Sequence, residues 1–178
     1  ILIAIAAISF LFYYLDPSRV VSSLGVRNTY LFTFLFAIVG GVSSLTATSF
    51  YTALFALALG GANPFWLAAF SAPGVLVGDL LFWYAGQKGQ ELARLVFGRS
   101  LTRFSSWLSK KPPWFVPIVV YLYTGLTILP GDFLMLALAL MGFPLKKIIL
   151  PTLLGNYTLT LLVSFGGIYG LTFARSIF

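Results

Sequence analysis

The feature that most constrains this chain is the scarcity of charge along its apolar runs. Eleven lysines and arginines and four acids are spread over 178 residues, and 60% of the residues are hydrophobic. Soluble domains average about 45–50% apolar and about 25% charged residues. The segment from Pro64 to Gln87 carries one charge and reaches the length of about twenty residues that a membrane-crossing helix needs. The composition therefore predicts an all-α integral membrane protein and excludes a soluble globule or a disordered chain.

The reactive side chains limit the chemistry of the protein. The chain has no cysteine and no histidine, which excludes disulfides, thiol nucleophiles, the usual zinc sites and an imidazole base. Its acids are Asp16, Asp79, Glu91 and Asp132, and no nucleophile–base pair accompanies them. We therefore expect no enzyme activity and no cofactor. The net charge of +7 comes from basic residues that flank the apolar runs, which favours an anionic membrane surface over a nucleic acid as the partner.

The order of apolar and polar segments predicts a single transmembrane domain, residues 1–178, in four parts. An N-terminal helix at 1–15 is the tail of a first span or, alternatively, the apolar region of a signal peptide. A first repeat at 29–87 and a second repeat at 114–173 flank a basic amphipathic linker helix at 88–113. Basic residues of this linker are expected to contact the membrane surface: Arg94, Arg99, Arg103, Lys110 and Lys111.

Each repeat begins with a segment whose apolar character is interrupted in the middle. Residues 30–39 and 50–59 are short apolar runs on either side of a Gly/Ser/Thr stretch. The second segment, 114–141, breaks at the Leu-Pro-Gly-Asp sequence of 129–132. Runs of ten residues make about 15 Å of helix, half of the hydrocarbon core of a bilayer. We therefore expect two re-entrant hairpins, and one long tilted helix over 30–60 is the alternative.

A shift of 81 residues aligns the two segments. The sequence Ala-Leu-Ala-Leu-x-Gly at 56–61 falls on the same pattern at 137–142. A glycine followed by a polar residue then occurs in each half, at 78–79 and at 155–156. Because a hairpin returns to its own side and the next span crosses, the second half must have the opposite orientation. This order predicts an inverted repeat, with the site between the halves near the membrane midplane.

Two carboxylates and one amide are the leading site candidates. Asp79 lies inside a predicted span, where a charged side chain is costly and by default functional; a neutral hydrogen bond to a neighbouring helix is the alternative. Asp132 follows Pro-Gly at the second tip, so it is an N-cap, a site acid or both. Asn156, the counterpart of Asp79 in the second half, is predicted to hydrogen-bond across helices or to join the site. We expect these groups to bind substrate or protons.

Hydroxyl groups at the first tip form a second set of candidates. Five of them are predicted to bind substrate: Ser43, Ser44, Thr46, Thr48 and Ser49. With the free N–H groups at the start of the following helix they can cradle a phosphate, or they satisfy broken backbone inside the bilayer. Tyr123 in the second hairpin is predicted to line the site or, alternatively, to serve in packing.

Three motifs occur in a characteristic order. They are Gly-Asp-Leu-Leu-Phe-Trp-Tyr-Ala-Gly-Gln-Lys-Gly at 78–89, Leu-Pro-Gly-Asp-Phe-Leu at 129–134 and Leu-Gly-Asn at 154–156. Their order resembles that of the DedA family, the VTT (SNARE-associated) domain proteins. The resemblance implies two opposed re-entrant hairpins and movement of lipids, such as undecaprenyl phosphate or phospholipids, in the cytoplasmic membrane of a prokaryote. The sequence differs from the family in having no acid at 43–49 and no arginine at 114–127, and buried arginines are natural phosphate clamps.

Two functions are expected from these observations. The first is a DedA-like flippase or scramblase that moves polyprenyl phosphate or phospholipid by alternating access, with intramembrane carboxylates and optional coupling to protons. The alternative is a proton- or cation-coupled carrier of a small solute. A structural subunit without transport activity is a further alternative. Membrane lipids are expected partners, nucleic acids are not, and the oligomeric state is left open.

Overall fold

The computed structural model describes residues 21–177 except 24, 43, 110 and 128–130. This part of the chain folds into helices without strands, which confirms the all-α prediction for it. The helices are α3 (Val26–Gly41), α4 (Ser44–Leu59), α5 (Pro64–Ser109), α6 (Phe115–Leu126), α7 (Gly131–Leu140) and α8 (Leu145–Ile177). The helix predicted at 1–15 lies outside the described residues.

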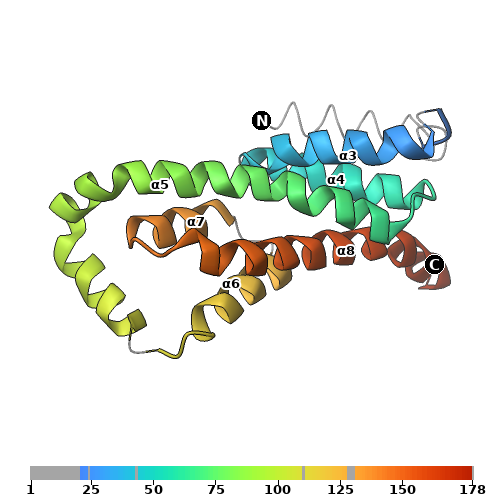
Figure 1. The fold of residues 1–178 in the computed structure, drawn as a ribbon. Helices are drawn as coiled ribbons and strands as arrows, with labels where there is room; N and C mark the ends of the chain where they lie inside the picture. The colour runs from blue at the N-terminus through green and yellow to red at the C-terminus, as the bar shows by residue number, and fades with distance from the viewer. Residues whose placement is uncertain (1–20, 24, 43, 110, 128–130, 178) are drawn as a thin grey trace.

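Two long helices define the long axis of the molecule (Figure 1). Their apolar parts, Pro64–Glu91 in α5 and Leu145–Tyr169 in α8, are long and apolar enough to cross a membrane. The two helices run in opposite directions and pack against each other. Large apolar side chains on their outer faces are half exposed, among them Leu81, Leu150 and Leu162. An apolar outer surface on helices of this length fits an integral membrane protein.

The other four described helices are too short to cross a bilayer. α3 and α4 have 16 residues each, α6 has 12 and α7 has 10. At 1.5 Å per residue they span about 15–24 Å, whereas the hydrocarbon core is about 30 Å thick. α3 and α4 run in opposite directions, and so do α6 and α7 (Figure 1). Residues 30–60 therefore do not form one long helix, and the predicted interruption is confirmed.

The first interruption is narrower than the sequence predicts. α3 ends at Gly41 and α4 begins at Ser44, so residues 44–49 form the first turns of α4. The Thr46 hydroxyl donates a hydrogen bond to the Val39 carbonyl oxygen at 2.7 Å. Hydroxyl side chains near a helix start can bond to neighbouring backbone without ending the helix. Here the Thr46 hydroxyl joins α4 to the end of α3, and residues 44–49 remain helical.

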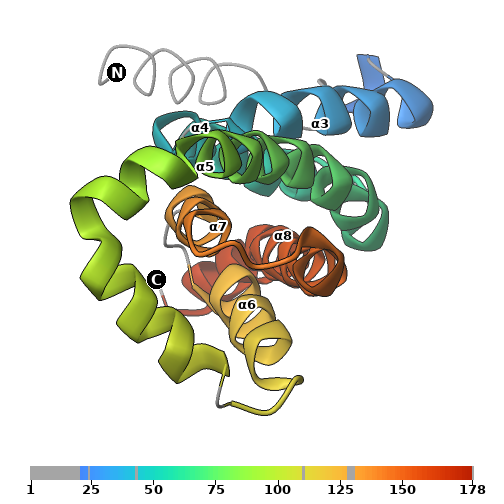
Figure 2. The same cartoon turned by 60° about the vertical axis from the view of Figure 1, so that its left-hand side comes forward.

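The basic stretch after residue 87 continues α5 and does not form a separate helix. α5 runs without interruption to Ser109, because the proline that follows Pro73 in the sequence is Pro112. The C-terminal part of α5 curves away from the axis of its apolar part (Figures 1 and 2). Lys111 is exposed. Lys110 and the side chains of Arg94, Arg99 and Arg103 lie outside the described residues.

The two halves exchange their second short helices. α3 packs on α5 and α6 packs on α8, so each first helix lies on the long helix of its own half. α4 instead packs on α8, and α7 packs on α5 (Figures 1 and 2). One hydrophobic cluster includes Phe50 and Leu57, and the other includes Val120 and Met135. The exchange brings the tips of both helix pairs to the middle of the molecule.

α4 and α7 end with the same backbone cap. Gly61 and Gly142 have φ angles of 94° and 74°, in the left-handed region that favours glycine. Each end is closed by the two hydrogen bonds of a Schellman cap. These bonds join Gly61 to Ala58 (3.1 Å), Ala62 to Leu57 (3.1 Å), Gly142 to Ala139 (2.8 Å) and Phe143 to Leu138 (2.9 Å). Every residue of the second cap lies 81 positions after its counterpart, which is the shift found in the sequence.

α4 and α7 contact the long helices at positions that are related by the same shift of 81 residues. A Cβ on Gly86 of α5 would lie 2.9 Å from the carbonyl oxygen of Leu136 in α7. A Cβ on Gly167 of α8 would lie 2.6 Å from the carbonyl oxygen of Phe55 in α4. Gly86 and Gly167 are 81 positions apart, and so are Phe55 and Leu136. Glycine at these positions lets two helix backbones approach closely, as is common where membrane helices pack.

This shift corrects the predicted counterpart of Asp79. Gly74 packs against the backbone of α3, and Gly155 packs against the backbone of α6, so these two glycines are equivalent. The predicted pairing of Asp79 with Asn156 used a shift of 77, and at a shift of 81 the counterpart of Asp79 is Thr160. The two registers differ by four residues, about one helical turn. Both therefore place a polar group on the same face of α8.

Candidate functional site

A cavity of about 460 Å³ lies where the tips of the two helix pairs meet. All six described helices contribute to its wall. One lining residue from each helix, in chain order, is Gly40, Thr48, Asp79, Thr124, Asp132 and Asn156. Because polar side chains from both halves converge here inside an apolar molecule, this cavity is the candidate site.

The floor of the cavity is a hydrogen-bonded pair of polar side chains. Asn156 Nδ2 donates to Asp79 Oδ2 at 2.7 Å. The exposed fraction is 3% for Asp79 and 5% for Asn156. A buried carboxylate needs such a donor, because burying it without one is costly. The predicted cross-helix hydrogen bond of Asn156 is present, and its partner is the predicted site acid.

Asp79 also touches the tip of the second helix pair. A Cβ on Gly131, the first residue of α7, would lie 2.8 Å from Asp79 Oδ1. Glycine at this position leaves room for the carboxylate beside the first turn of α7. The N-terminus of a helix carries partial positive charge and favours a negative group nearby. Asp79 therefore links α5, on which it lies, to both α7 and α8.

Glycines bring the first tip onto α5 next to Asp79. A Cβ on Gly78 would overlap the backbone of Gly41. A Cβ on Gly41 would lie 2.7 Å from the Val75 carbonyl oxygen. The end of α3 therefore lies backbone to backbone on α5, an approach that only small residues permit. This contact is the local reason why the Gly-Asp sequence places its carboxylate at the tip.

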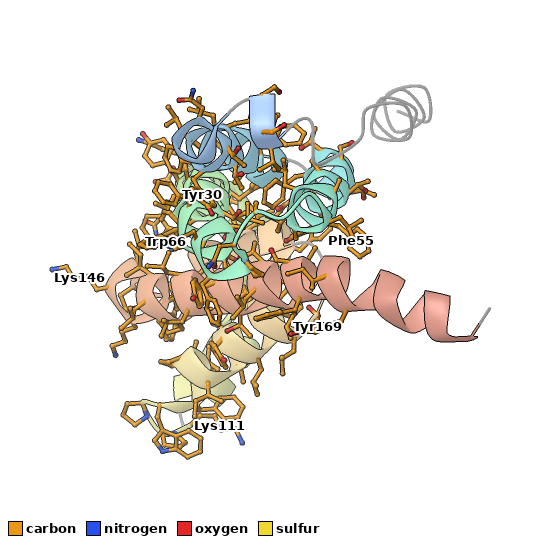
Figure 3. The ribbon with its side chains drawn as sticks, turned by 90° about the vertical axis from the view of Figure 1, so that its right-hand side faces the viewer. Tyr30, Phe55, Trp66, Lys111, Lys146 and Tyr169 are labelled. Atoms are coloured by element: carbon orange, nitrogen blue, oxygen red, sulfur yellow. The ribbon has the colours of Figure 1, made fainter. Side chains whose placement is uncertain are left out.

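The rim of the cavity lies on α4. Thr48, Thr52 and Phe55 line the cavity and are exposed on their outer sides, whereas Asp79 and Asn156 are buried. Figure 3 shows Phe55 at the outside of the molecule, where α4 meets α8. The cavity thus leads from the surface of α4 inward to the buried pair.

The hydroxyl groups predicted at the first tip take different places. Thr48 lines the cavity. Thr46 donates to backbone carbonyl oxygens at the end of α3, and Ser49 is 8% exposed and does not line the cavity. Ser43 and the side chain of Ser44 lie outside the described residues. Of the hydroxyls that the structure describes, Thr46 thus matches the alternative of a bond to broken backbone, and Thr48 lines the cavity.

The second tip contributes one predicted residue and one that sequence reasoning missed. Asp132 lines the cavity in the first turn of α7, a position compatible with a site acid and with stabilisation of the helix start. Tyr123 is half-buried and is not among the lining residues. The neighbouring Thr124 lines the cavity instead and is 4% exposed.

α4 contributes two further lining residues that sequence reasoning missed, Tyr51 and Thr52. The sequence pattern places both in the short apolar run 50–59 and marks neither as a site residue. Thr48, Tyr51 and Thr52 are three and four residues apart, so they share one face of a helix. Polar groups at this spacing in an otherwise apolar helix are the signal that could have identified the face.

Among the described residues, those that line the cavity include two acidic and no basic side chains. Asp79 and Asp132 are its charged groups, and no lysine or arginine is among the described residues that line it. Lys88 and Lys111 lie elsewhere, each over an aromatic ring, at 5.5 Å and 5.6 Å from the ring centre. Within the described part of the chain, no group of three His, Cys, Asp or Glu residues could hold a metal ion.

Comparison with known proteins adds no relative. No family model, curated protein or solved structure matches this chain. The resemblance of its motifs to the DedA family therefore stays a prediction.

Proposed function

We propose that this protein is a membrane transporter that moves lipid headgroups through the central cavity by alternating access. The observation that carries the proposal is the buried Asp79–Asn156 pair at the floor of a cavity that both halves line. Ionisable side chains inside membrane domains are costly, so they mark pathways of substrates or protons. The headgroup would enter the cavity while its acyl chains stay in the surrounding lipid.

In this proposal α3–α4 and α6–α7 are re-entrant hairpins that enter the membrane from opposite faces. The length of these helices supports it, because each is shorter than the hydrocarbon core. Their open ends lie at opposite ends of the molecule, and their tips meet at the cavity (Figure 1). Irregular backbone is tolerated at membrane depth where protein covers it or where it borders a cavity.

The proposal also treats the two halves as inverted repeats. Three observations support it: the antiparallel long helices, the equivalent caps at Gly61 and Gly142, and the exchange of α4 and α7. Transporters built from inverted repeats carry their site near the bilayer midplane and open it alternately to the two sides. Because α4 packs on α8 and α7 packs on α5, a movement of either long helix would also move the short helix that the other half contributes.

The charged ends of the molecule support a membrane orientation. Exposed lysines occur in the C-terminal part of α5, just before α6 and in the first turn of α8, and these segments lie at one end of the molecule (Figure 1). They are Lys88, Lys111, Lys146 and Lys147. Basic residues gather on the cytoplasmic side of membrane proteins. We therefore propose that this end faces the cytoplasm and that the cavity lies between the two membrane surfaces.

A second function is a proton- or cation-coupled carrier of a small solute. The observation that favours it is the pair of carboxyl groups on a wall without described basic side chains. A carboxylate that exchanges its amide partner for a proton or cation could couple ion movement to the opening of the cavity. Lipid transport remains the first proposal because the rim of the cavity lies on the exposed face of α4.

The test is lipid flux in proteoliposomes that contain the purified protein. Phospholipids labelled on an acyl chain report movement between leaflets when a membrane-impermeant reductant bleaches the outer leaflet. Asp79→Asn keeps the size of the side chain and removes the carboxylate. We expect it to slow the flux at least tenfold, the change produced by about 1.4 kcal/mol of activation free energy.

Glu91→Gln is the matched control, because Glu91 is an exposed carboxylate on the same helix and does not line the cavity. It should retain the wild-type rate. Wild-type flux in Asp79→Asn would remove the buried carboxylate from the mechanism. Uptake of a small solute that depends on Asp79, without lipid flux, would establish the second function in place of the first.

A further inference from the structure

Two carboxyl groups and two threonine oxygens of the cavity are hydrogen-bond acceptors, while Thr48 and Tyr51 add hydroxyls that can accept or donate. The Thr52 hydroxyl donates its proton to the Thr48 carbonyl oxygen at 2.8 Å. The Thr124 hydroxyl donates its proton to the Val120 carbonyl oxygen at 2.9 Å. A hydroxyl has one proton and two lone pairs, so both oxygens can offer a ligand only an acceptor. The carboxyl groups of the wall add further acceptor oxygens when ionised.

One place where an anion could bind, the first turn of α7, lies next to carboxylates. This turn carries Asp132, whereas the first two turns of α4 contribute Ala47 and Thr48 to the wall. Asp79 Oδ1 lies beside Gly131 at the same turn of α7. One amide donor of Asn156 is bonded to Asp79. A phosphate placed here would meet two carboxylates and no cationic side chain among the described residues, and burying an unpaired anion is costly.

Aromatic rings complete the wall on the side of α4. Phe50, Tyr51 and Phe55 line the cavity. The faces of such rings carry partial negative charge and attract ammonium groups. The volume of about 460 Å³ is within the range of small-molecule sites. Rings, carboxylates and acceptor hydroxyls thus all favour a cation that donates several hydrogen bonds.

We infer that the cavity binds its ligand by a protonated primary amine. An ammonium group has one positive charge and three N–H donors and no acceptor, which is the complement of this wall. In the site it would lie between Asp79 and Asp132, with the Thr124 oxygen as an uncharged acceptor. The amine belongs to an aminophospholipid headgroup, whose phosphate would stay at the rim on α4 and away from the carboxylates, or to a free small amine. The lipid source rests on the proposed function, whereas the free amine does not.

The lipid source is tested by headgroup selectivity in the same proteoliposomes. Two probes carry the same acyl-chain label, phosphatidylethanolamine with an ammonium group and phosphatidylglycerol without one. We expect the ethanolamine lipid to move at least ten times faster through the wild-type protein. Asp79→Asn should remove this preference, and Glu91→Gln should keep it. The comparison of headgroups uses the wild-type protein and so does not depend on the folding of a variant.

The free amine is tested by binding to the detergent-solubilised protein. Ethanolamine should raise the thermal unfolding temperature saturably, and glycerol at the same concentration should not. This shift should disappear in Asp79→Asn and persist in Glu91→Gln. A shift without lipid selectivity identifies a free amine as the ligand, and selectivity identifies the lipid headgroup.

The inference is overturned when phosphatidylglycerol moves as fast as phosphatidylethanolamine and ethanolamine does not stabilise the protein. In that case flux of both lipids leaves the proposed transport function standing. Absence of all lipid flux contradicts the proposed lipid transport, while stabilisation by ethanolamine would still support the amine site. The two failures are therefore distinguishable.

Discussion

Replacing Asn156 with leucine tests the energetic role of the buried pair. Leucine is close to asparagine in size, so the change removes the Nδ2 donor of the 2.7 Å hydrogen bond to Asp79 without leaving a large void. Asp79 is 3% exposed, so only a small part of its carboxylate is open to water from the cavity. A buried polar group that loses its partner costs about 1–3 kcal/mol, and more when it is charged. We expect Asn156→Leu to lower the free energy of unfolding by about 2 kcal/mol.

A double-mutant cycle with Asp79→Leu isolates the energy of the pair. Each single replacement leaves one polar group buried without its partner. The double replacement removes both groups, and with them the cost of burying an unpaired one. Hydrogen bonds between membrane helices average about 0.6 kcal/mol and reach about 1.7 kcal/mol. A short bond to a carboxylate belongs at the strong end, so we expect a coupling energy of about 1.5 kcal/mol.

The assay is reversible unfolding in mixed micelles, with rising dodecyl sulfate and circular dichroism as the signal. The wild type, both single variants and the double variant supply the four free energies of the cycle. The double variant should be more stable than the sum of the single effects implies. Single effects that add within about 0.5 kcal/mol would mean that the two side chains do not interact, and the description of the cavity floor would be refuted.

Two further predictions concern glycines and use the same titration. Gly78→Ala should destabilise the protein by about 1–3 kcal/mol or more, because its methyl group would overlap the Gly41 backbone. Gly89→Ala is the control, because its methyl group would lie at an ordinary 3.5 Å from one side chain, so it should not destabilise the protein. Equal stabilities of the Gly78→Ala and Gly89→Ala variants would contradict the packing of the first tip. Gly61→Ala and Gly142→Ala should each cost about 1–2 kcal/mol, because L residues strain a left-handed backbone. A neutral effect of either change would contradict the common cap.

The helices and their interruptions were largely predictable from the sequence. The long apolar runs that contain Asp79 and Asn156 became α5 and α8, and the two interrupted segments became pairs of short helices. Glycine, proline and uncharged runs act over a few residues, so their effect can be recognised locally. The capping glycines Gly61 and Gly142 belong to the same class, because the motif before each is short and contiguous.

Other features depended on contacts that a local pattern does not contain. The sequence pairs Asp79 with Asn156, whereas the helix contacts pair it with Thr160, one helical turn later. The two pairings compete because shifts of 77 and 81 residues both align a glycine. The sequence also treated Tyr51 and Thr52 as part of an apolar arm, although α4 directs them to the cavity. For Thr46 it left open a phosphate cradle or a bond to broken backbone, and the structure has the hydroxyl donate to the end of α3.

By itself the sequence determined that this chain is helical, apolar on its outside and poor in reactive groups, because those properties are set by composition and by runs of neighbouring residues. Only the tertiary structure decided which polar groups meet. The Asn156–Asp79 hydrogen bond joins residues 77 positions apart. It lies between α5 and α8, which pack against each other, while glycines let α3 approach α5 and let α4 approach α8. Contacts of this range are settled by the packing of whole helices, so the polar cavity forms only when both halves are assembled.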